Sequence, residues 1–159
     1  MKRKTNKKKL TTEQALSKAM KYCAYQERCH REVRNKLYEW GLLKNEVENI
    51  MARLVTDGFL NEERFAKVFA GGKFRMKKWG TVKIENELKK RDVSEYCIQQ
   101  GLKEIEASDY EKILIELIEK KWREITEKDL FVKRNKTAKY LIAKGYEGEL
   151  VWKKIRGKC

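Results

Sequence analysis

Residues 58–93 read GFLNEERFAKVFAGGKFRMKKWGTVKIENELKKRDV and carry the clearest helical pattern in the chain. Asn61 is a residue type that is favoured at helix N-caps, and Glu62 and Glu63 follow it where carboxylates interact well with the helix dipole. The sequence therefore predicts an amphipathic helix that starts just after this cap. Its expected apolar stripe is Phe65, Val68, Phe69, Gly72 and Met76.

The helical pattern continues beyond the Trp-Gly pair in the same stretch. Ile84 and Leu88 lie one turn apart on a second helix, which we expect to break near Asp92. A third helix is expected to open at Ser94, another favoured N-cap residue. Its apolar stripe is Ile98, Gly101, Leu102 and Ile105. This part of the chain is therefore expected to form a three-helix unit.

The same pattern occurs three times, with an internal period of about fifty residues. Four positions of one round match four positions of each of the others. The matched sets are Leu37, Gly41, Leu42 and Val47; Leu88, Asp92, Val93 and Ile98; and Leu141, Gly145, Tyr146 and Val151. Such a period indicates stacked units that bury their apolar faces against neighbours. We expect an all-α fold, built as an elongated tandem array of three three-helix repeats.

The expected organisation has four parts. They are a disordered basic N-terminal arm over residues 1–11 and three-helix repeats over residues 12–60, 61–107 and 108–159. Further helix starts are expected at Thr12, at Ser108, which fits a capping box with Glu111, and at Thr126.

The composition agrees with a helical protein that has a polyanionic partner. The chain has 159 residues, no proline, 41% hydrophobic residues and 40% charged residues. Its formal net charge of +15 directs attention to nucleic acid or an acidic protein surface. No apolar run reaches the ~20 residues of a membrane span, and the basic N-terminus lacks the apolar stretch of a signal peptide. We therefore expect no membrane partner.

Little in the sequence points to catalysis or to a metal. His30 is the only histidine, and Cys23, Cys29 and His30 lack a fourth ligand in nearby sequence. No glycine-rich phosphate loop occurs. The four cysteines show no repeated close spacing and are expected to be free thiols in a reducing compartment. We expect a cytoplasmic binding protein without cofactor or enzymatic activity.

Two clusters of basic residues are the candidate binding residues. The first cluster is Lys73, Arg75, Lys77, Lys78, Lys83, Lys89, Lys90 and Arg91. The second cluster is Lys133, Arg134, Lys136, Lys139 and Lys144, with no acidic residue among residues 133–144. Such residues contact phosphates and give salt-dependent affinity without sequence selectivity. The alternative is that each cluster is an ordinary solvated helical face.

Two further features have alternative interpretations. Trp79, next to Gly80, is a candidate for stacking on a base, but a core anchor at a helix junction is the favoured interpretation. Gly71 and Gly72 lie inside a helical pattern, which predicts close helix packing or a kink.

The central stretch resembles the signature of the RecX family. The matching residues are Gly58-Phe59-Leu60-Asn61-Glu62-Glu63-Arg64-Phe65-Ala66, then Trp79-Gly80, Lys83-Ile84, Glu87-Leu88 and Asp92-Val93. The first round adds Arg28, Glu32-Val33, Lys36-Leu37 and Gly41, and the third adds Lys136, Leu141 and Lys144-Gly145-Tyr146. The departures are Cys29, Asn61 and Asp92, where the family usually has serine, aspartate and glycine. All three are helix-boundary positions, so they concern local caps.

The resemblance implies a bacterial regulator of the RecA recombinase. It implies a curved, elongated array of three repeats that binds within the groove of the RecA–DNA filament and restrains RecA ATPase, strand exchange and coprotease functions. On this hypothesis the chain acts as a monomer in recombination and DNA repair, and contacts single-stranded DNA without sequence preference.

The alternative hypothesis is a free-standing DNA-binding protein of helix-turn-helix type, because three-helix modules with a basic helix resemble such readers. Sequence-specific readers carry Arg, Asn or Gln on an exposed recognition helix. The basic helices here are rich in lysine, which suits contact with the DNA backbone better.

Overall fold

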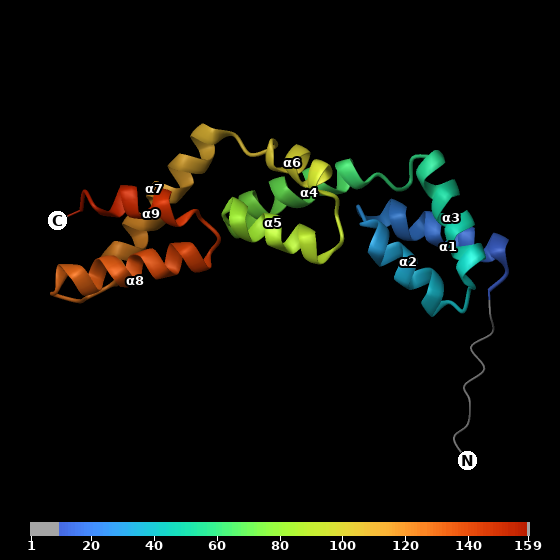
Figure 1. The fold of residues 1–159 in the computed structure, drawn as a ribbon, viewed down its shortest axis with the longest axis horizontal. Helices are drawn as coiled ribbons and strands as arrows, with labels where there is room; N and C mark the ends of the chain where they lie inside the picture. The colour runs from blue at the N-terminus through green and yellow to red at the C-terminus, as the bar shows by residue number, and fades with distance from the viewer. Residues whose placement is uncertain (1–9, 159) are drawn as a thin grey trace, which may run out of the picture.

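The computed structural model describes residues 10–158, and all the regular secondary structure in that range is helical. The elements are α1 (Thr12–Tyr25), α2 (His30–Glu39), α3 (Lys44–Thr56), α4 (Glu62–Gly72), a π-helical turn η1 (Lys73–Lys77), α5 (Thr81–Lys90), α6 (Glu95–Leu102), α7 (Ala107–Glu124), α8 (Leu130–Ala143) and α9 (Gly148–Ile155). Three groups of helices lie in a row along the long axis of the molecule (Figure 1). We call them module one (α1–α3), module two (α4–α6 with η1) and module three (α7–α9).

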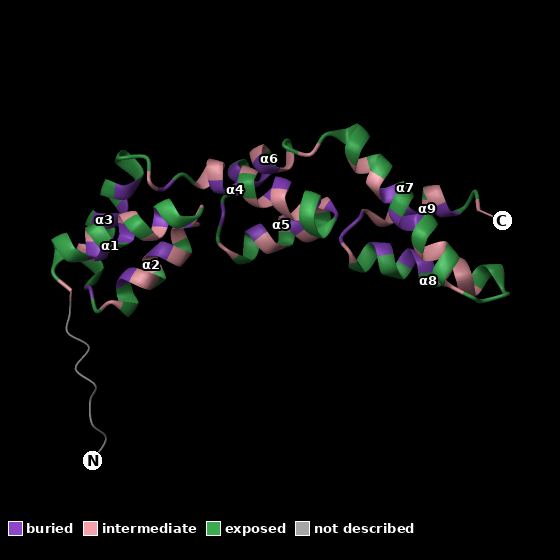
Figure 2. Cartoon of the chain, turned by 180° about the vertical axis from the view of Figure 1, so that it is seen from behind, coloured by how far each residue is buried: buried purple, intermediate pink, exposed green. Residues whose placement is uncertain are grey.

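Each module has its own hydrophobic core, which confirms the predicted all-α array of three-helix repeats. The core of module one is centred on Val33, Leu37 and Leu54, which are fully buried. Ile84, Leu88 and Ile98 occupy the equivalent place in module two. Leu114, Leu141, Val151 and Ile155 do so in module three. The buried faces turn inward within each group of helices (Figure 2).

The internal repeat is visible in the way in which the second helix of each module ends. Gly41, Asp92 and Gly145 all have positive φ angles, of 86°, 57° and 104°. In each case the next residue donates its N–H to the carbonyl five residues back, as in a Schellman motif. These bonds are Leu42 to Leu37 (3.3 Å), Val93 to Leu88 (3.2 Å) and Tyr146 to Leu141 (3.1 Å). Asp92 therefore takes the same position in the motif as Gly41 and Gly145, because aspartate tolerates the left-handed region.

Three predicted helix starts are wrong by one or more residues. The cap of α1 is Thr11, whose hydroxyl accepts from the Gln14 N–H, and not Thr12. Helix α7 begins at Ala107, so Ser108 is inside the helix and forms no capping box. The cap of α8 is Asp129, whose carboxylate accepts from the Phe131 N–H at 2.8 Å, and not Thr126.

The predicted apolar stripe of α4 is also wrong in part. Val68 and Met76 are 52% and 85% exposed, whereas Ala66, Ala70 and Phe74 are buried. The cause is the close approach of α6, because a Cβ atom on Gly101 would lie 2.6 Å from the carbonyl oxygen of Ala66. The helix turns its small residues toward α6 and leaves the larger ones at the edge.

The glycine pair of α4 does not provide that close packing. A Cβ atom on Gly72 would meet nothing within 4 Å, and the three atoms nearest to one on Gly71 all belong to the flexible Arg75 side chain. The helix continues directly into the π-helical turn η1. Among residues 10–158, none of the helices is both long enough and apolar enough to span a bilayer.

Candidate nucleic-acid interface

Modules two and three meet through an interlocked pair of loops. The Gly80 N–H donates to the Lys144 carbonyl at 3.0 Å, and the Val82 N–H donates to the Gly145 carbonyl at 2.9 Å. A Cβ atom on Gly80 would lie 2.2 Å from the carbonyl carbon of Gly145. Only glycine fits at such a distance, so these two backbones define how the modules sit relative to each other.

Side chains reinforce the same junction. The buried Tyr146 hydroxyl donates to the Lys78 carbonyl at 2.9 Å. The Tyr110 ring lies 5.1 Å from the Tyr146 ring, and its hydroxyl donates to Glu147 at 2.8 Å while accepting from the Thr81 N–H at 3.2 Å. Burial raises the pKa of Tyr110 to about 12, so this hydroxyl stays protonated and remains a donor. The junction is a satisfied polar network, which holds its surroundings in one geometry.

Four lysines gather around this junction in a pocket of about 150 Å³. Lys78 follows η1, Lys120 and Lys121 lie in the last turns of α7, and Lys144 follows α8. The Lys121 and Lys144 ammonium groups lie 4.4 Å and 5.7 Å from the centre of the Tyr140 ring. We call this group the lysine pocket. Its other lining residues are Leu117, Glu124 and Tyr140.

The lysine pocket has an excess of positive charge. Of its described lining residues only Glu124 is acidic, and that carboxylate lies 3.8 Å from the Lys121 ammonium group. Three ammonium groups therefore have no carboxylate partner within the part of the chain that the structure describes. Lys78 also has φ = 56°, a backbone conformation that is unfavourable for a residue other than glycine. Strained residues of this kind are often found at functional sites. A phosphate group has the charge and the acceptor oxygens that such a pocket would bind.

The first predicted cluster is divided between the two ends of module two. Lys78 lies in the lysine pocket, and Lys73 and Lys83 place their ammonium groups 5.1 Å and 4.5 Å from the Trp79 ring. Arg75 and Lys77 are exposed on η1. At the other end, Lys89 pairs with Glu85, and Lys90 and Arg91 pair with Glu87. These eight residues therefore do not form one continuous patch.

The second predicted cluster is also only partly gathered. Lys144 lies in the lysine pocket, whereas Lys133 lies 4.4 Å from the centre of the Trp122 ring. Arg134 donates to the Lys158 carbonyl at 2.6 Å. Lys136 pairs with Glu127 at 2.6 Å. A carboxylate outside residues 133–144 therefore neutralises part of the positive charge of this cluster. Lys139 is exposed on α8.

Trp79 occupies a half-buried position against the core of module two. Its ring makes an edge-on contact with Phe69, with the centroids 6.5 Å apart. The two flanking lysines cover the ring further. This arrangement agrees with the core-anchor interpretation rather than with base stacking.

The buried thiols among the described residues add no further site residues. Cys23, Cys29 and Cys97 are free and buried, and burial raises the pKa values of Cys23 and Cys29 to about 11. Across residues 10–158, no group of three His, Cys, Asp or Glu residues is arranged to hold a metal. Most of the predicted basic arm, residues 1–9, lies outside the described residues.

Lys120 and Lys121 are the pocket residues that the sequence analysis missed. They stand three and four positions after the buried Leu117, with Glu124 at seven, so a helical projection places them beside it. That spacing was readable in the sequence. The approach of Lys78 and Lys144 was not, because it depends on the packing of Gly80 against Gly145.

Comparison with known proteins gives matches along most of the chain. Sequence models of the first, second and third three-helix domains of RecX match residues 15–54, 61–102 and 109–155. The Regulatory protein RecX of Pseudomonas savastanoi is 27% identical over 140 residues, which cover 88% of both chains. That of Prosthecochloris aestuarii is 29% identical over 97 residues, 61% of this chain and 64% of the relative. That of Clostridium perfringens is 29% identical over 119 residues, and the matched part spans 55% of its length.

A solved structure shows the same fold. The crystal structure of RecX from Lactobacillus salivarius superposes with a TM-score of 0.83 at 19% identity, covering 91% of this chain and 94% of that one. Three consecutive domain matches, in chain order, account for each of the three modules. The chain therefore belongs to the RecX family of regulatory proteins.

Proposed function

We propose that this chain binds the RecA–DNA filament and restrains the ATPase and recombinase activities of RecA. The observation that supports this proposal most strongly is the lysine pocket. It combines four cationic side chains from both basic modules in a junction whose backbone is held by hydrogen bonds. A pre-organised cationic pocket binds a phosphate of the DNA backbone with little loss of conformational entropy.

The distribution of charge suggests which modules contact DNA. Residues 11–60 have 8 basic and 7 acidic residues, whereas residues 108–159 have 14 basic and 9 acidic ones. Module one is therefore nearly neutral, and modules two and three carry most of the excess charge of the described residues. We propose that modules two and three contact the DNA backbone, and that module one contacts protein.

The extended shape supports binding to a polymer by one copy of the chain. A row of three modules offers several separate contacts, and linked contacts strengthen one another through effective concentration. Lysine contacts with phosphates carry no sequence information, so a DNA contact of this kind has no sequence preference and weakens steeply with salt.

The test is the ATPase activity of RecA on single-stranded DNA, measured while the full-length protein is titrated in. The proposal requires inhibition at amounts comparable to the filament, and the absence of any effect at stoichiometric concentration would refute it. Binding to duplex DNA without RecA is measured in parallel. A tight, salt-resistant preference for one duplex sequence would instead support a free-standing DNA-binding protein.

A further inference from the structure

An apolar groove of about 670 Å³ lies between modules one and two. Its floor is the outer edge of α4 and η1, including Phe69, Val68 and Met76. Val68 and Met76 are 52% and 85% exposed, although both are apolar. The groove rim is formed by Gln26, Glu27, Glu32, Lys73, Lys77 and Arg91.

The π-helical turn presents Met76 to this groove. Within Lys73–Lys77 the ring of Phe74 is buried in the core of module two, while Met76 is turned outward. Turns of this kind occur frequently at functional sites. Methionine is flexible and polarisable, so it adapts to different apolar surfaces.

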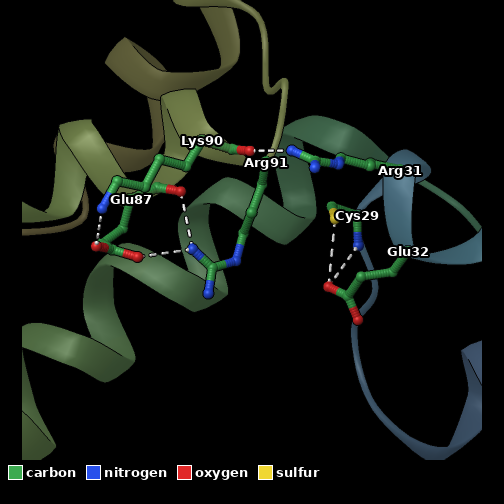
Figure 3. Close-up of polar contacts among 6 residues, drawn as sticks. All are labelled: Cys29, Arg31, Glu32, Glu87, Lys90 and Arg91. Carbon is green, nitrogen blue, oxygen red and sulfur yellow. Dashed lines mark hydrogen bonds and ion pairs between the residues drawn. The ribbon is translucent and has the colours of Figure 1, made fainter.

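Polar contacts between the two modules hold the walls of the groove in place. Arg31 donates to the Lys90 carbonyl across the junction (Figure 3) and lies 3.6 Å from the Asp92 carboxylate. Arg64 of α4 pairs with Glu27 at 2.5 Å. Cys29, which precedes α2, is buried with the core of module two. The groove is therefore a feature of the folded junction.

The charge left unpaired on the rim is positive. Glu27 is paired with Arg64, and Glu32 lies 3.7 Å from Arg28. Arg91 is paired with Glu87 (Figure 3), with the guanidinium 3.1 Å from the carboxylate. Lys73 and Lys77, in contrast, have no carboxylate partner within residues 10–158. An occupant with negative charge next to its apolar part would match this rim.

The groove is poorly suited to a nucleic acid base. The Phe69 ring on its floor is only partly exposed, and the Lys73 and Arg91 cations lie 5.4 Å and 4.8 Å from its centre. A base would have to displace both cations before stacking. Aliphatic side chains of a partner can instead pack against the exposed Val68 and Met76 without displacing either cation.

We infer that this groove receives a short segment of a partner protein, which inserts apolar side chains against Val68 and Met76 and sets acidic residues beside Lys73 and Lys77. The volume lies within the usual range of binding pockets and admits more than one side chain. This contact adds a protein-binding site to the proposed function, but it does not depend on DNA binding.

The test uses a labelled synthetic peptide with two leucines four residues apart and glutamates on both sides, and measures its fluorescence anisotropy with the full-length protein. We expect saturable binding, and a loss of about tenfold in affinity in the double variant Val68→Ser/Met76→Ser. Phe131→Ser is the matched control, because Phe131 is 75% exposed on α8, away from the groove. This control leaves the affinity unchanged.

Two further peptides test the chemistry of the occupant. Replacing the leucines with serines abolishes binding, and replacing the glutamates with lysines lowers the affinity about tenfold. The inference is overturned if the acidic leucine peptide does not bind the wild-type protein saturably, if the lysine peptide binds equally well, or if the double variant binds like the wild type while its thermal unfolding is unchanged.

Discussion

The backbone N–H of Gly80 donates a hydrogen bond to the carbonyl oxygen of Lys144 over 3.0 Å, and this bond ties module two to module three. The bond also fixes the positions of surface side chains. Lys78 stands two residues before Gly80, and its side chain lines the same pocket as that of Lys144. One backbone contact therefore brings together two lysines that are distant in the sequence.

Gly80→Ala should destabilise the protein strongly. A Cβ atom there would lie 2.2 Å from the backbone of Gly145, so the junction must separate, at a cost of about 2 kcal/mol or more in the free energy of unfolding. Gly72→Ala is the matched control in α4, where the added methyl meets nothing within 4 Å and is expected to stabilise by about 0.5–1 kcal/mol. Urea unfolding measures both, and equal stabilities would contradict the described junction.

Lys78→Gly should separate stability from binding. Because Lys78 has φ = 56°, glycine relieves its strain and is expected to raise the free energy of unfolding by up to about 1 kcal/mol. The lost charge should weaken binding to single-stranded DNA and lower the salt slope by about 0.7. Asp92→Gly relieves the same strain at φ = 57° outside the lysine pocket. If DNA binding falls equally in both variants, the pocket has no special role.

Charge reversal in the lysine pocket should weaken DNA binding more than reversal elsewhere. Lys120→Glu/Lys144→Glu places two carboxylates where a phosphate is expected and should lower the affinity for single-stranded DNA about tenfold or more. Lys18→Glu/Lys21→Glu makes the same change in net charge on α1 of module one. Similar losses in the two variants would show that only the total charge matters.

Stability should fall at alkaline pH because of the buried thiols. Burial raises the pKa of Cys29 from 9.0 to about 11, and that of Cys23 by a similar amount, whereas the unfolded chain ionises near 9. The unfolded state therefore releases protons first, so this contribution is complete below about pH 9 and is lost between pH 9 and pH 11. Thermal unfolding of the wild type and of Cys23→Ala/Cys29→Ser from pH 8 to 10.5 should show a shallower decline in the double variant. Parallel curves would argue against this origin.

Much of the fold follows from local sequence, because the helix ends are chemically marked. The equivalent positions Gly41, Asp92 and Gly145 were recognised by spacing alone, and all three adopt positive φ. Asn61 caps α4 as predicted, accepting from the Arg64 N–H at 2.9 Å. These features depend on interactions within one turn of helix, which the sequence specifies directly.

What the sequence did not predict depends on contacts between distant helices. Periodicity alone does not show whether α4 buries Val68 and Met76 or Ala66 and Ala70. The small residues are buried because Gly101 lets α6 approach α4 closely on that side. The division of the first basic cluster has a similar cause. Its two ends face different neighbouring modules, and module packing is not encoded in charge spacing.

The most direct test of the central claim compares two titrations of RecA ATPase on single-stranded DNA, one with the wild-type protein and one with Lys120→Glu/Lys144→Glu. The account predicts that the wild type inhibits at stoichiometric amounts, and that the variant, with unchanged thermal unfolding, needs about tenfold more protein for the same inhibition. Inhibition curves that coincide would contradict the claim that the lysine pocket contacts the filament.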